Sequence, residues 1–254
     1  RNISTNPMVS PCDGIIAARG HVDMCDGGFL ENLEPKLNKA ENSSSKLPIL
    51  KVKQYRCSIS TLLGYENIEE FFGRHFIEEK KQQKKCLYYC VLRLPIGSYH
   101  HFHAPSNIQV MQRKHIPGYL HPTSPKLNPA AVCTNERLIL SGKWNQGFFA
   151  LAAIGGLGRG SIRLSIEPEI ETNLVGQSVG KITEHPYRYT TSGYDTSYLP
   201  PKLLQKGEDL GHFRFGSCVV LVFEGEEGLR WSQENGQRVA MGEALVAAAI
   251  DGEE

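Results

Sequence analysis

Short apolar segments, each bounded by Gly, Pro, Asn or Ser, recur along the chain and constrain its fold more than any other feature. Runs of this length and composition are typical of β-strands. The segments predicted as strands are 14–19, 49–52, 86–94, 108–111, 136–140, 148–154, 161–166 and 218–223. Helical pattern is sparse by comparison, and its clearest example covers residues 68–81. The sequence therefore predicts a β-rich α+β fold, a single compact domain of mainly antiparallel sheet with few helices.

Two turn sequences echo each other in the second half of the chain. Lys-Gly-Glu-Asp-Leu-Gly at 206–211 and Met-Gly-Glu-Ala-Leu at 241–245 each place a Gly-Glu-x-Leu turn beside a strand. Such turns are typical of barrel-sandwich-like hairpins, and two unrelated tight turns are the alternative. A glycine-rich segment at 155–160 lacks both the dinucleotide spacing G-x-G-x-x-G and a P-loop lysine. We expect it to be a turn that joins two strands.

Charge and cysteine content narrow the class of protein. The chain has 28 Lys and Arg against 27 Asp and Glu, so no strong net charge indicates nucleic acid as a partner. The seven cysteines are scattered and include no Cys-x-x-Cys, which favours neither a disulfide framework nor a zinc site. The longest uncharged stretch, 144–158, is too short and too rich in glycine to span a bilayer. Because the chain begins at Arg1 without a targeting pattern, we expect it to be part of a longer precursor.

The dipeptide Gly216-Ser217 stands just before the apolar run 219–223. A serine hydroxyl can attack the carbonyl of the preceding residue only if the backbone bends unusually, and glycine has no Cβ to resist that bend. Ser217 is therefore a candidate for cutting its own chain. A simple turn that enters a sheet is the alternative.

Three histidines and one aspartate are candidates for acid–base chemistry. His100, His101 and His103 lie close together, and imidazole titrates near neutral pH. No His-Glu-x-x-His and no cysteine at a ligand spacing accompanies them, which disfavours a metal site. A carboxylate that orients a histidine, which in turn takes a proton from a serine, activates that serine as a nucleophile. Asp13, His103 and Ser217 supply these groups, although each alone also fits an ordinary loop residue.

Five blocks of sequence occur in an order that resembles the phosphatidylserine decarboxylase family of pyruvoyl-dependent enzymes. The blocks are Ser-Pro-Cys-Asp-Gly at 10–14, Tyr-His-His-Phe-His-Ala-Pro at 99–105, Ile-Pro-Gly-Tyr-Leu at 116–120, Asn-Glu-Arg at 135–137 and Lys-Gly-Glu-Asp-Leu-Gly-His-Phe-Arg-Phe-Gly-Ser at 206–217. Each block is modest, but their ordered occurrence is specific. The chain departs from the family pattern at Cys218, where Thr or Ser is usual, and at Ser98, where Asp is common.

The resemblance implies a self-cleavage triad of Asp13, His103 and Ser217. The bond before Ser217 is expected to break, which leaves a larger β chain, 1–216, and a smaller α chain, 217–254. Ser217 would become a covalent pyruvoyl cofactor, which accepts electrons when the substrate loses CO₂.

The resemblance also implies the substrate and the surroundings. The expected reaction converts phosphatidylserine in a membrane to phosphatidylethanolamine, and His100 matches a histidine implicated in the decarboxylation itself. The mitochondrial inner membrane is the expected location, and a homodimer is a further candidate assembly. An interfacial element that contacts the bilayer is a further candidate, with packing on the core as the equal alternative. Its residues are Leu62, Leu63, Phe71, Phe72, Phe76 and Ile77, with the lysines at 80, 81, 84 and 85.

Two other functions are weighed against this one. One is a pyruvoyl-dependent decarboxylase of a soluble amino acid, and the other is a lipid-binding or scaffold homologue that never cuts itself. A serine hydrolase that acts on other molecules would use the same three groups. No Gly-x-Ser-x-Gly elbow surrounds Ser217, which disfavours that class.

Overall fold

The structure is a computed structural model. It describes residues 1–23, 29–30, 58–66, 85–123, 130–156, 161–170, 172–173, 179, 181–186, 201–214 and 217–247. The predicted strand at 49–52, the predicted helix at 68–81 and Gly216 lie outside these residues. The described residues form fifteen strands and two short helices, α1 (Ile59–Leu63) and α3 (Ala131–Thr134), and neither helix is long enough to cross a membrane. The predicted sheet-rich fold class is confirmed.

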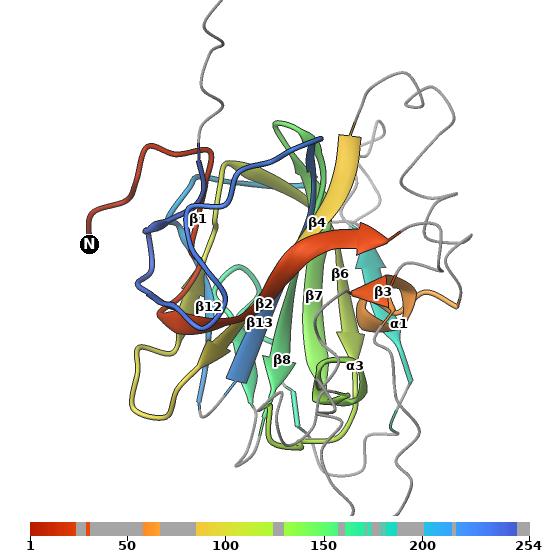
Figure 1. The fold of residues 1–254 in the computed structure, drawn as a ribbon. Helices are drawn as coiled ribbons and strands as arrows, with labels where there is room; N and C mark the ends of the chain where they lie inside the picture. Colours follow the sequence, from red (N-terminus) through yellow and green to blue (C-terminus); the bar gives the residue numbers. More distant parts are fainter. Residues whose placement is uncertain are drawn as a thin grey trace, which may run out of the picture.

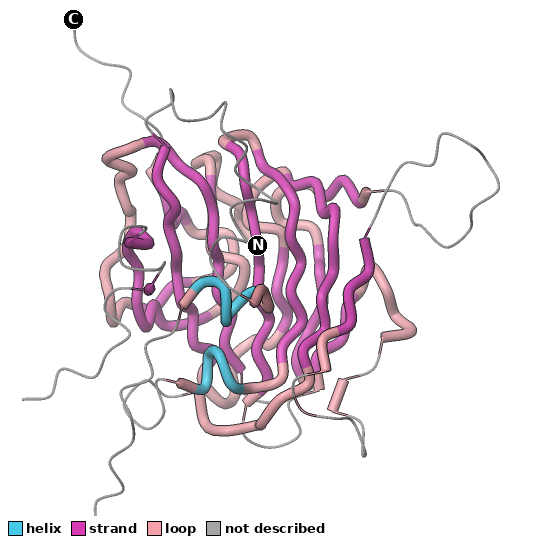
Figure 2. Tube along the Cα trace, turned by 90° about the vertical axis from the view of Figure 1, so that its right-hand side faces the viewer, coloured by secondary structure: helices cyan, strands magenta, loops and turns pink. Residues whose placement is uncertain are grey.

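A ten-stranded antiparallel sheet forms the body of the described structure (Figures 1 and 2). Its strand order is β10-β6-β7-β8-β13-β4-β2-β14, while β11 pairs with β6 and β3 pairs with β2. The strands are β2 Gly14–Asp23, β3 Phe29–Leu30, β4 Lys85–Leu94, β6 Ile108–Ile116, β7 Arg137–Trp144, β8 Gly147–Gly155, β10 Thr183–Pro186, β11 Lys202–Leu204, β13 Ser217–Glu226 and β14 Arg238–Val239. Six of the predicted strand segments fall largely or wholly within these strands.

A three-stranded antiparallel sheet and the two helices cover opposite faces of the ten-stranded sheet. The small sheet has the order β5 (His101–His103), β12 (Asp209–Phe213) and β9 (Ile162–Leu164), the last lying within the predicted strand 161–166. β1 (Met8–Val9) pairs separately with β15 (Ala244–Val246). In Figure 1, β12 lies to the left of the large sheet, and α1 and α3 lie to its right. The two faces therefore have separate cores, one between the sheets and one beneath the helices.

The apolar run of β13 contributes to both cores. Val219 and Leu221 belong to the cluster between the sheets, whereas Val220 and Val222 belong to the cluster beneath the helices. A strand that is covered on both faces shows a continuous apolar sequence instead of alternation, because neighbouring side chains point to opposite faces.

Leu62 and Leu63 on α1 pack into the core beneath the helices. Their side chains are 0% and 2% exposed. Core packing is therefore the correct interpretation of these two residues, and the rest of the predicted interfacial element before Lys85 lies outside the described residues.

The two echoing turn sequences fold in the same way. They form turns at residues 205–208 and 240–243. In each turn the glutamate N–H donates to the carbonyl of the first residue, at 3.0 and 3.1 Å. The glutamate carboxylate accepts from the N–H of that first residue, at 2.9 and 3.0 Å. The glycine has a left-handed φ, +87° in one turn and +91° in the other, which glycine adopts without strain.

These two turns position the segments that carry the predicted site residues. Ser10 exchanges two backbone hydrogen bonds with the second turn, at 2.7 and 3.0 Å. Ala104 exchanges two with the first turn, both 2.8 Å. The N–H of His103 in turn donates to the carbonyl of Pro11 at 2.8 Å. The segments that carry Asp13 and His103 therefore lie side by side.

Replacing Gly242 by alanine should destabilise the protein more than replacing Gly236. Both glycines have a left-handed φ, so each substitution costs about 1 kcal/mol of backbone strain. A Cβ at Gly242 would also lie 2.7 Å from the carbonyl oxygen of Asn2, whereas a Cβ at Gly236 would meet no atom of the described residues within 4 Å. Urea denaturation should show an additional loss of about 1–3 kcal/mol for Gly242→Ala. Equal losses would contradict the proposed close approach.

Candidate active site

Ser217 is the first residue of β13 and is held in the middle of the large sheet. It pairs with Leu94 on β4 and with Gly155 on β8. Its side chain points to the same face as that of Val219, towards the core between the two sheets. The residue is 1% exposed, and its Oγ has no hydrogen-bond partner among the described residues. An unsatisfied buried hydroxyl costs about 1–3 kcal/mol, which marks Ser217 as a functional candidate.

His103 lies at the end of β5 with both ring nitrogens engaged. Its Nδ1 is 3.0 Å from the carbonyl oxygen of Gly207, and its Nε2 is 2.8 Å from the hydroxyl of Tyr99. A carbonyl can only accept, so Nδ1 carries the proton and Nε2 accepts a hydrogen bond from Tyr99. Burial lowers the pKa of His103 below its usual value. The ring is therefore neutral at pH 7 and can act as a base through Nε2.

Asp13 follows directly after the segment that pairs with His103. Its Oδ1 accepts a hydrogen bond from the N–H of Met241 at 2.8 Å and forms an ion pair with Arg1. Partial burial acts to raise the pKa of Asp13, but the hydrogen bonds from Arg1 and Met241 outweigh it, and the pKa is lowered overall. His103 contributes to this lowering through its charged form. Asp13 therefore stays ionised and lies within electrostatic range of His103.

The described contacts bring Asp13 and His103 close together, but no described contact joins Ser217 to either of them. The carbonyl of Gly207, and not Asp13, accepts from Nδ1 of His103. The carboxylate found close to the other nitrogen, Nε2, belongs to Asp209, at 3.8 Å. Among the described residues, Ser217 hydrogen-bonds to neither group. The Asp13–His103–Ser217 relay therefore stays a prediction.

Hydrogen bonds to its neighbours hold His100 in place, and one of its ring nitrogens has no partner among the described residues. Its Nδ1 is 2.5 Å from the carbonyl oxygen of Ser98, and its own carbonyl accepts from the N–H of Phe213 at 2.9 Å. Ser98 also closes a turn, because its hydroxyl donates to the carbonyl of Pro95 at 2.7 Å. The Nε2 of His100 is buried and has no partner among the described residues. This nitrogen can hold or release a proton.

Sequence reasoning did not select Tyr99 or Asp209, which both contact the histidines. The Tyr99 ring packs against both His101 and His103, with ring centres 5.1 and 5.7 Å away. Asp209 accepts from Nδ1 of His101 at 2.9 Å. His101 therefore lies beside the candidate site, where it contacts Tyr99 and Asp209. Both missed residues lie inside the sequence blocks at 99–105 and 206–217, which is the signal that could have identified them.

Cys218 occupies the position after Ser217 as an apolar residue. It is 1% exposed and packs in the core beneath the helices. Burial raises the pKa of its thiol to about 12, so the side chain stays neutral. Cys12, Cys86, Cys90 and Cys218 are free, whereas Cys133 is disulfide-bonded, which the sequence did not predict.

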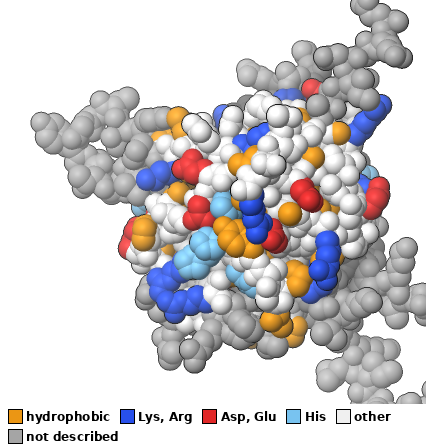
Figure 3. All heavy atoms as spheres, turned by 90° about the vertical axis from the view of Figure 1, so that its left-hand side faces the viewer, with side chains coloured by type: hydrophobic (Ala, Val, Ile, Leu, Met, Phe, Trp, Pro, Cys, Tyr) orange, Lys and Arg blue, Asp and Glu red, His pale blue; other side chains and the backbone are white. Residues whose placement is uncertain are grey.

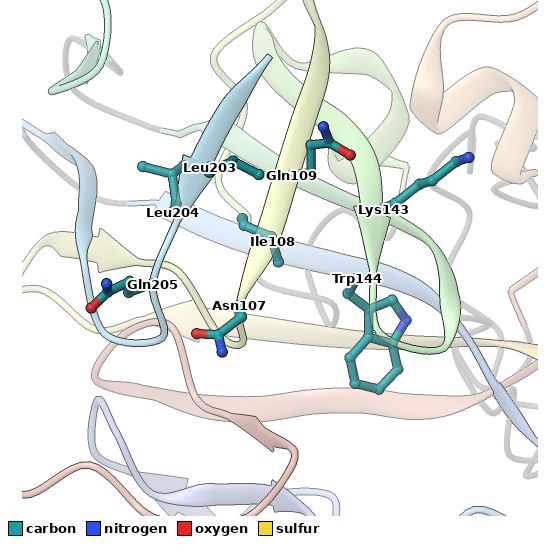
Figure 4. A pocket seen from close by; sticks show the side chains of 8 residues that line it. All are labelled: Asn107, Ile108, Gln109, Lys143, Trp144, Leu203, Leu204 and Gln205. Carbon is teal, nitrogen blue, oxygen red and sulfur yellow. The ribbon is translucent and has the colours of Figure 1, made fainter.

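A cavity of about 520 Å³ lies at the edge of the large sheet, where β6, β7 and β11 meet (Figure 4). Ile108 lies in its middle, between Leu203 and Leu204 on one side and Trp144 on the other. Among the described residues, no predicted catalytic side chain lines this cavity. It is therefore separate from the candidate active site.

Comparison with known protein families decides the family of this chain. The family model for phosphatidylserine decarboxylase matches residues 1–247. The chain belongs to the phosphatidylserine decarboxylase family. This membership confirms the resemblance drawn from the five sequence blocks.

Curated relatives agree with this family. A mitochondrial phosphatidylserine decarboxylase proenzyme of Cricetulus griseus is 36% identical over 94% of this chain and 54% of its own length. The mitochondrial proenzyme of Caenorhabditis elegans is 29% identical over 98% of this chain and 55% of its own. The proenzyme 1 of Schizosaccharomyces pombe, also named mitochondrial, is 35% identical over 93% of this chain and 63% of its own. The chain thus spans little more than half the length of these relatives.

Acid should destabilise the protein partly through His103. Its pKa is lower in the folded state than the value of about 6.5 in the unfolded chain, so below that pH the unfolded state binds more protons. The free energy of unfolding should be highest above pH 6.5 and should fall as the pH is lowered. Denaturation between about pH 7.5 and 5 should show a smaller fall for His103→Gln than for the unaltered protein. The same fall in both proteins would contradict this contribution.

Proposed function

We propose that this chain is the self-processing part of a pyruvoyl-dependent decarboxylase that converts phosphatidylserine to phosphatidylethanolamine and CO₂. The observation that carries the proposal is the buried hydroxyl of Ser217, which has no partner among the described residues and stands at the start of a doubly paired strand. The family model and the proenzyme names of the relatives support it. Residues 1–254 are proposed to form one catalytic domain, divided after Gly216.

The first proposed reaction cuts the chain. His103 takes the proton of the Ser217 hydroxyl, and Oγ attacks the carbonyl carbon of Gly216, so that an ester replaces the peptide bond. Loss of the Ser217 α-proton and of the ester carboxylate leaves dehydroalanine at residue 217 and a free carboxylate on Gly216. Addition of water and loss of ammonia then leave a keto group. Asp13 remains ionised and stabilises the positive charge that His103 gains.

The residues around Ser217 fit a cofactor made from this side chain. Its Oγ is already buried, and the following strand is fixed by pairing with β4 and β8. The pyruvoyl group supplies an electron sink for the electrons released when CO₂ leaves. His100, whose Nε2 has no partner among the described residues, would hold the proton that the substrate carbon then takes up.

The two fragments are proposed to stay together after the cut. Ten residues of β13 pair with β4, and seven of them also pair with β8. β14 pairs with β2, and β15 pairs with β1, so every described strand after the cut is bound to the strands before it. The described part of the proposed α chain, 217–247, therefore contributes strands to the ten-stranded sheet and to the β1–β15 pair.

A membrane substrate and a mitochondrial location are also part of the proposal. The curated relatives described above are named mitochondrial, and the resemblance implies the inner membrane. Assembly into a homodimer stays a prediction that analytical ultracentrifugation would test. Two experiments test the alternative functions. An assay on free serine would detect a decarboxylase of soluble amino acids. An intact mass equal to that of the uncut chain would indicate a scaffold homologue.

Replacing Ser217 by alanine should leave a single uncut chain, because no hydroxyl is available to attack Gly216. The unaltered protein should give two bands on a denaturing gel but one peak in gel filtration. Ser10→Ala is the matched control, since Ser10 is also a buried serine but donates to the carbonyl of Cys12 at 2.7 Å. Normal splitting of Ser217→Ala would exclude the proposed cleavage site.

Replacing His100 and His103 by alanine should separate the two reactions. His103→Ala should slow the cut about 10²–10⁴-fold, because the base for Ser217 is lost. His100→Ala should be cut normally but should turn over phosphatidylserine about 10²–10⁴-fold more slowly. This is the rate factor that one general acid or base typically contributes. A time course on gels measures the cut, and release of labelled CO₂ measures turnover. Loss of cutting in His100→Ala would assign that residue to the first reaction instead.

A further inference from the structure

Two of the five family blocks, 116–120 and 135–137, supply no residue to the proposed reactions. The structure brings these two blocks together. The N–H of Glu136 donates to the carbonyl of Tyr119 at 2.8 Å. A Cβ at Gly118 would lie 2.6 Å from the backbone nitrogen of Glu136, so only glycine permits this close approach. The two blocks therefore form one packed unit at the start of β7.

This unit holds Gly155, the residue of β8 that pairs with Ser217. The N–H of Gly155 donates to the carbonyl of Glu136 at 2.8 Å. In a regular antiparallel ladder Glu136 would also donate to Gly155, but its N–H is already given to Tyr119. The side chain of Asn135 supplies the missing donor, because its Nδ2 lies 2.7 Å from the carbonyl oxygen of Gly155. An asparagine amide thus continues the ladder between β7 and β8 by one hydrogen bond.

Gly155 is held beside Ser217 partly from the β7 side. Both of its backbone polar groups are engaged there, by Glu136 and Asn135. The N–H and C=O of a strand residue point towards the same neighbouring strand, so Gly155 and Ser217 form a non-hydrogen-bonded pair. Residues in such pairs approach each other most closely. A change in the position of Gly155 would therefore be felt directly at Ser217.

The Asn135 side chain is completely buried, and its oxygen and nitrogen are both engaged. Its Nδ2 also donates to the carbonyl of His121 at 2.8 Å, and its Oδ1 accepts from the N–H of His121 at 3.1 Å. These bonds fix the orientation of the amide, because a carbonyl can only accept and an N–H can only donate. All of these partners are backbone groups. Asn135 is therefore suited to hold chain segments in place.

The candidate histidines lie on the opposite face of the large sheet from α3. His101 and His103 belong to β5 of the small sheet, and Figure 3 shows histidine side chains gathered near the middle of that side of the molecule. Asn135 directly follows α3, which lies on the other side of the large sheet in Figure 1. Acid–base groups and the Asn135 contact thus come from different faces of the sheet.

We propose that Asn135 is a positioning residue, which holds Gly155 and so fixes residue 217 for both proposed reactions. This inference rests on the proposed function. In the first reaction the Ser217 hydroxyl must lie against the carbonyl carbon of Gly216. In the second, residue 217 must stay in place to act on the substrate. A misplacement of about 1 Å can slow a reaction about 10²-fold, so loss of the Asn135 contact should slow both.

Replacing Asn135 by alanine should slow the cut about 10- to 100-fold in protein that circular dichroism shows to be folded. Asn135→Ser should be slowed less, because its hydroxyl can still donate one hydrogen bond, and it decides the test if the alanine variant does not fold. Thr134→Val is the matched control. It removes a side-chain hydrogen bond of similar length from the neighbouring residue, to the carbonyl of Ala130 at 3.0 Å, and should be cut normally. Normal cutting of the folded Asn135 variants would overturn the proposal.

Variant protein left to cut to completion separates positioning from stability. Phenylhydrazine reacts with the pyruvoyl group, so a titration with it counts the active sites. In Asn135→Ala, kcat per titrated site should fall about tenfold, while KM for phosphatidylserine should change less than about twofold. A merely structural role would lower the number of sites and leave kcat per site unchanged. That result would contradict the proposal.

Amide hydrogen exchange in the uncut Ser217→Ala protein tests the contact without any reaction. The N–H of Gly155 should exchange about two- to tenfold faster after Asn135→Ala, which is the effect of losing one hydrogen bond, and at the same rate after Thr134→Val. Unchanged exchange in Asn135→Ala would overturn the proposal. If the unaltered protein proves uncut or inactive, the proposed function fails, whereas this measurement still decides whether Asn135 holds Gly155.

Discussion

The pairing of β13 with a strand on each side is the constraint on which the candidate site depends. Ser217 is the first residue of this strand, so the backbone after it is fixed by ladders to β4 and β8. Its hydroxyl, in contrast, is buried and has no described partner. Any change of backbone conformation at Ser217 must therefore take place before this residue in the chain, at the bond that joins it to Gly216. A strand fixed in this way keeps the new terminus in place when the preceding bond is broken.

The rest of the candidate site is held mainly through backbone groups. The two similar turns fix the segments that carry Asp13 and His103, and the carbonyl of Gly207 sets the protonated nitrogen of His103. The carbonyl of Ser98 likewise anchors His100. A backbone carbonyl is present whatever the side chain. This explains how the site tolerates serine at position 98, where the family commonly has aspartate.

The sequence predicted the strands well, because apolar runs and bounding turn residues are local signals. It also detected the paired turns, whose geometry depends on a glycine and a glutamate in sequence. It did not predict the partners of His103, since Gly207 lies 104 residues away and the contact exists only once β5 and β12 pair. Tyr99 was missed for a different reason. It lies four positions before His103 in the sequence, and only the bend of the chain brings the two rings together.

The contact between Tyr99 and His103 bears on the order of events at the site. The Nε2 of His103 accepts a hydrogen bond from the Tyr99 hydroxyl, and the same nitrogen must take the proton of Ser217 if His103 is the base. One lone pair cannot serve both donors at once. Burial raises the pKa of Tyr99, which keeps its hydroxyl protonated and the hydrogen bond intact near neutral pH. Activation of Ser217 therefore requires exchange of this hydrogen bond, and the arrangement described here precedes that exchange.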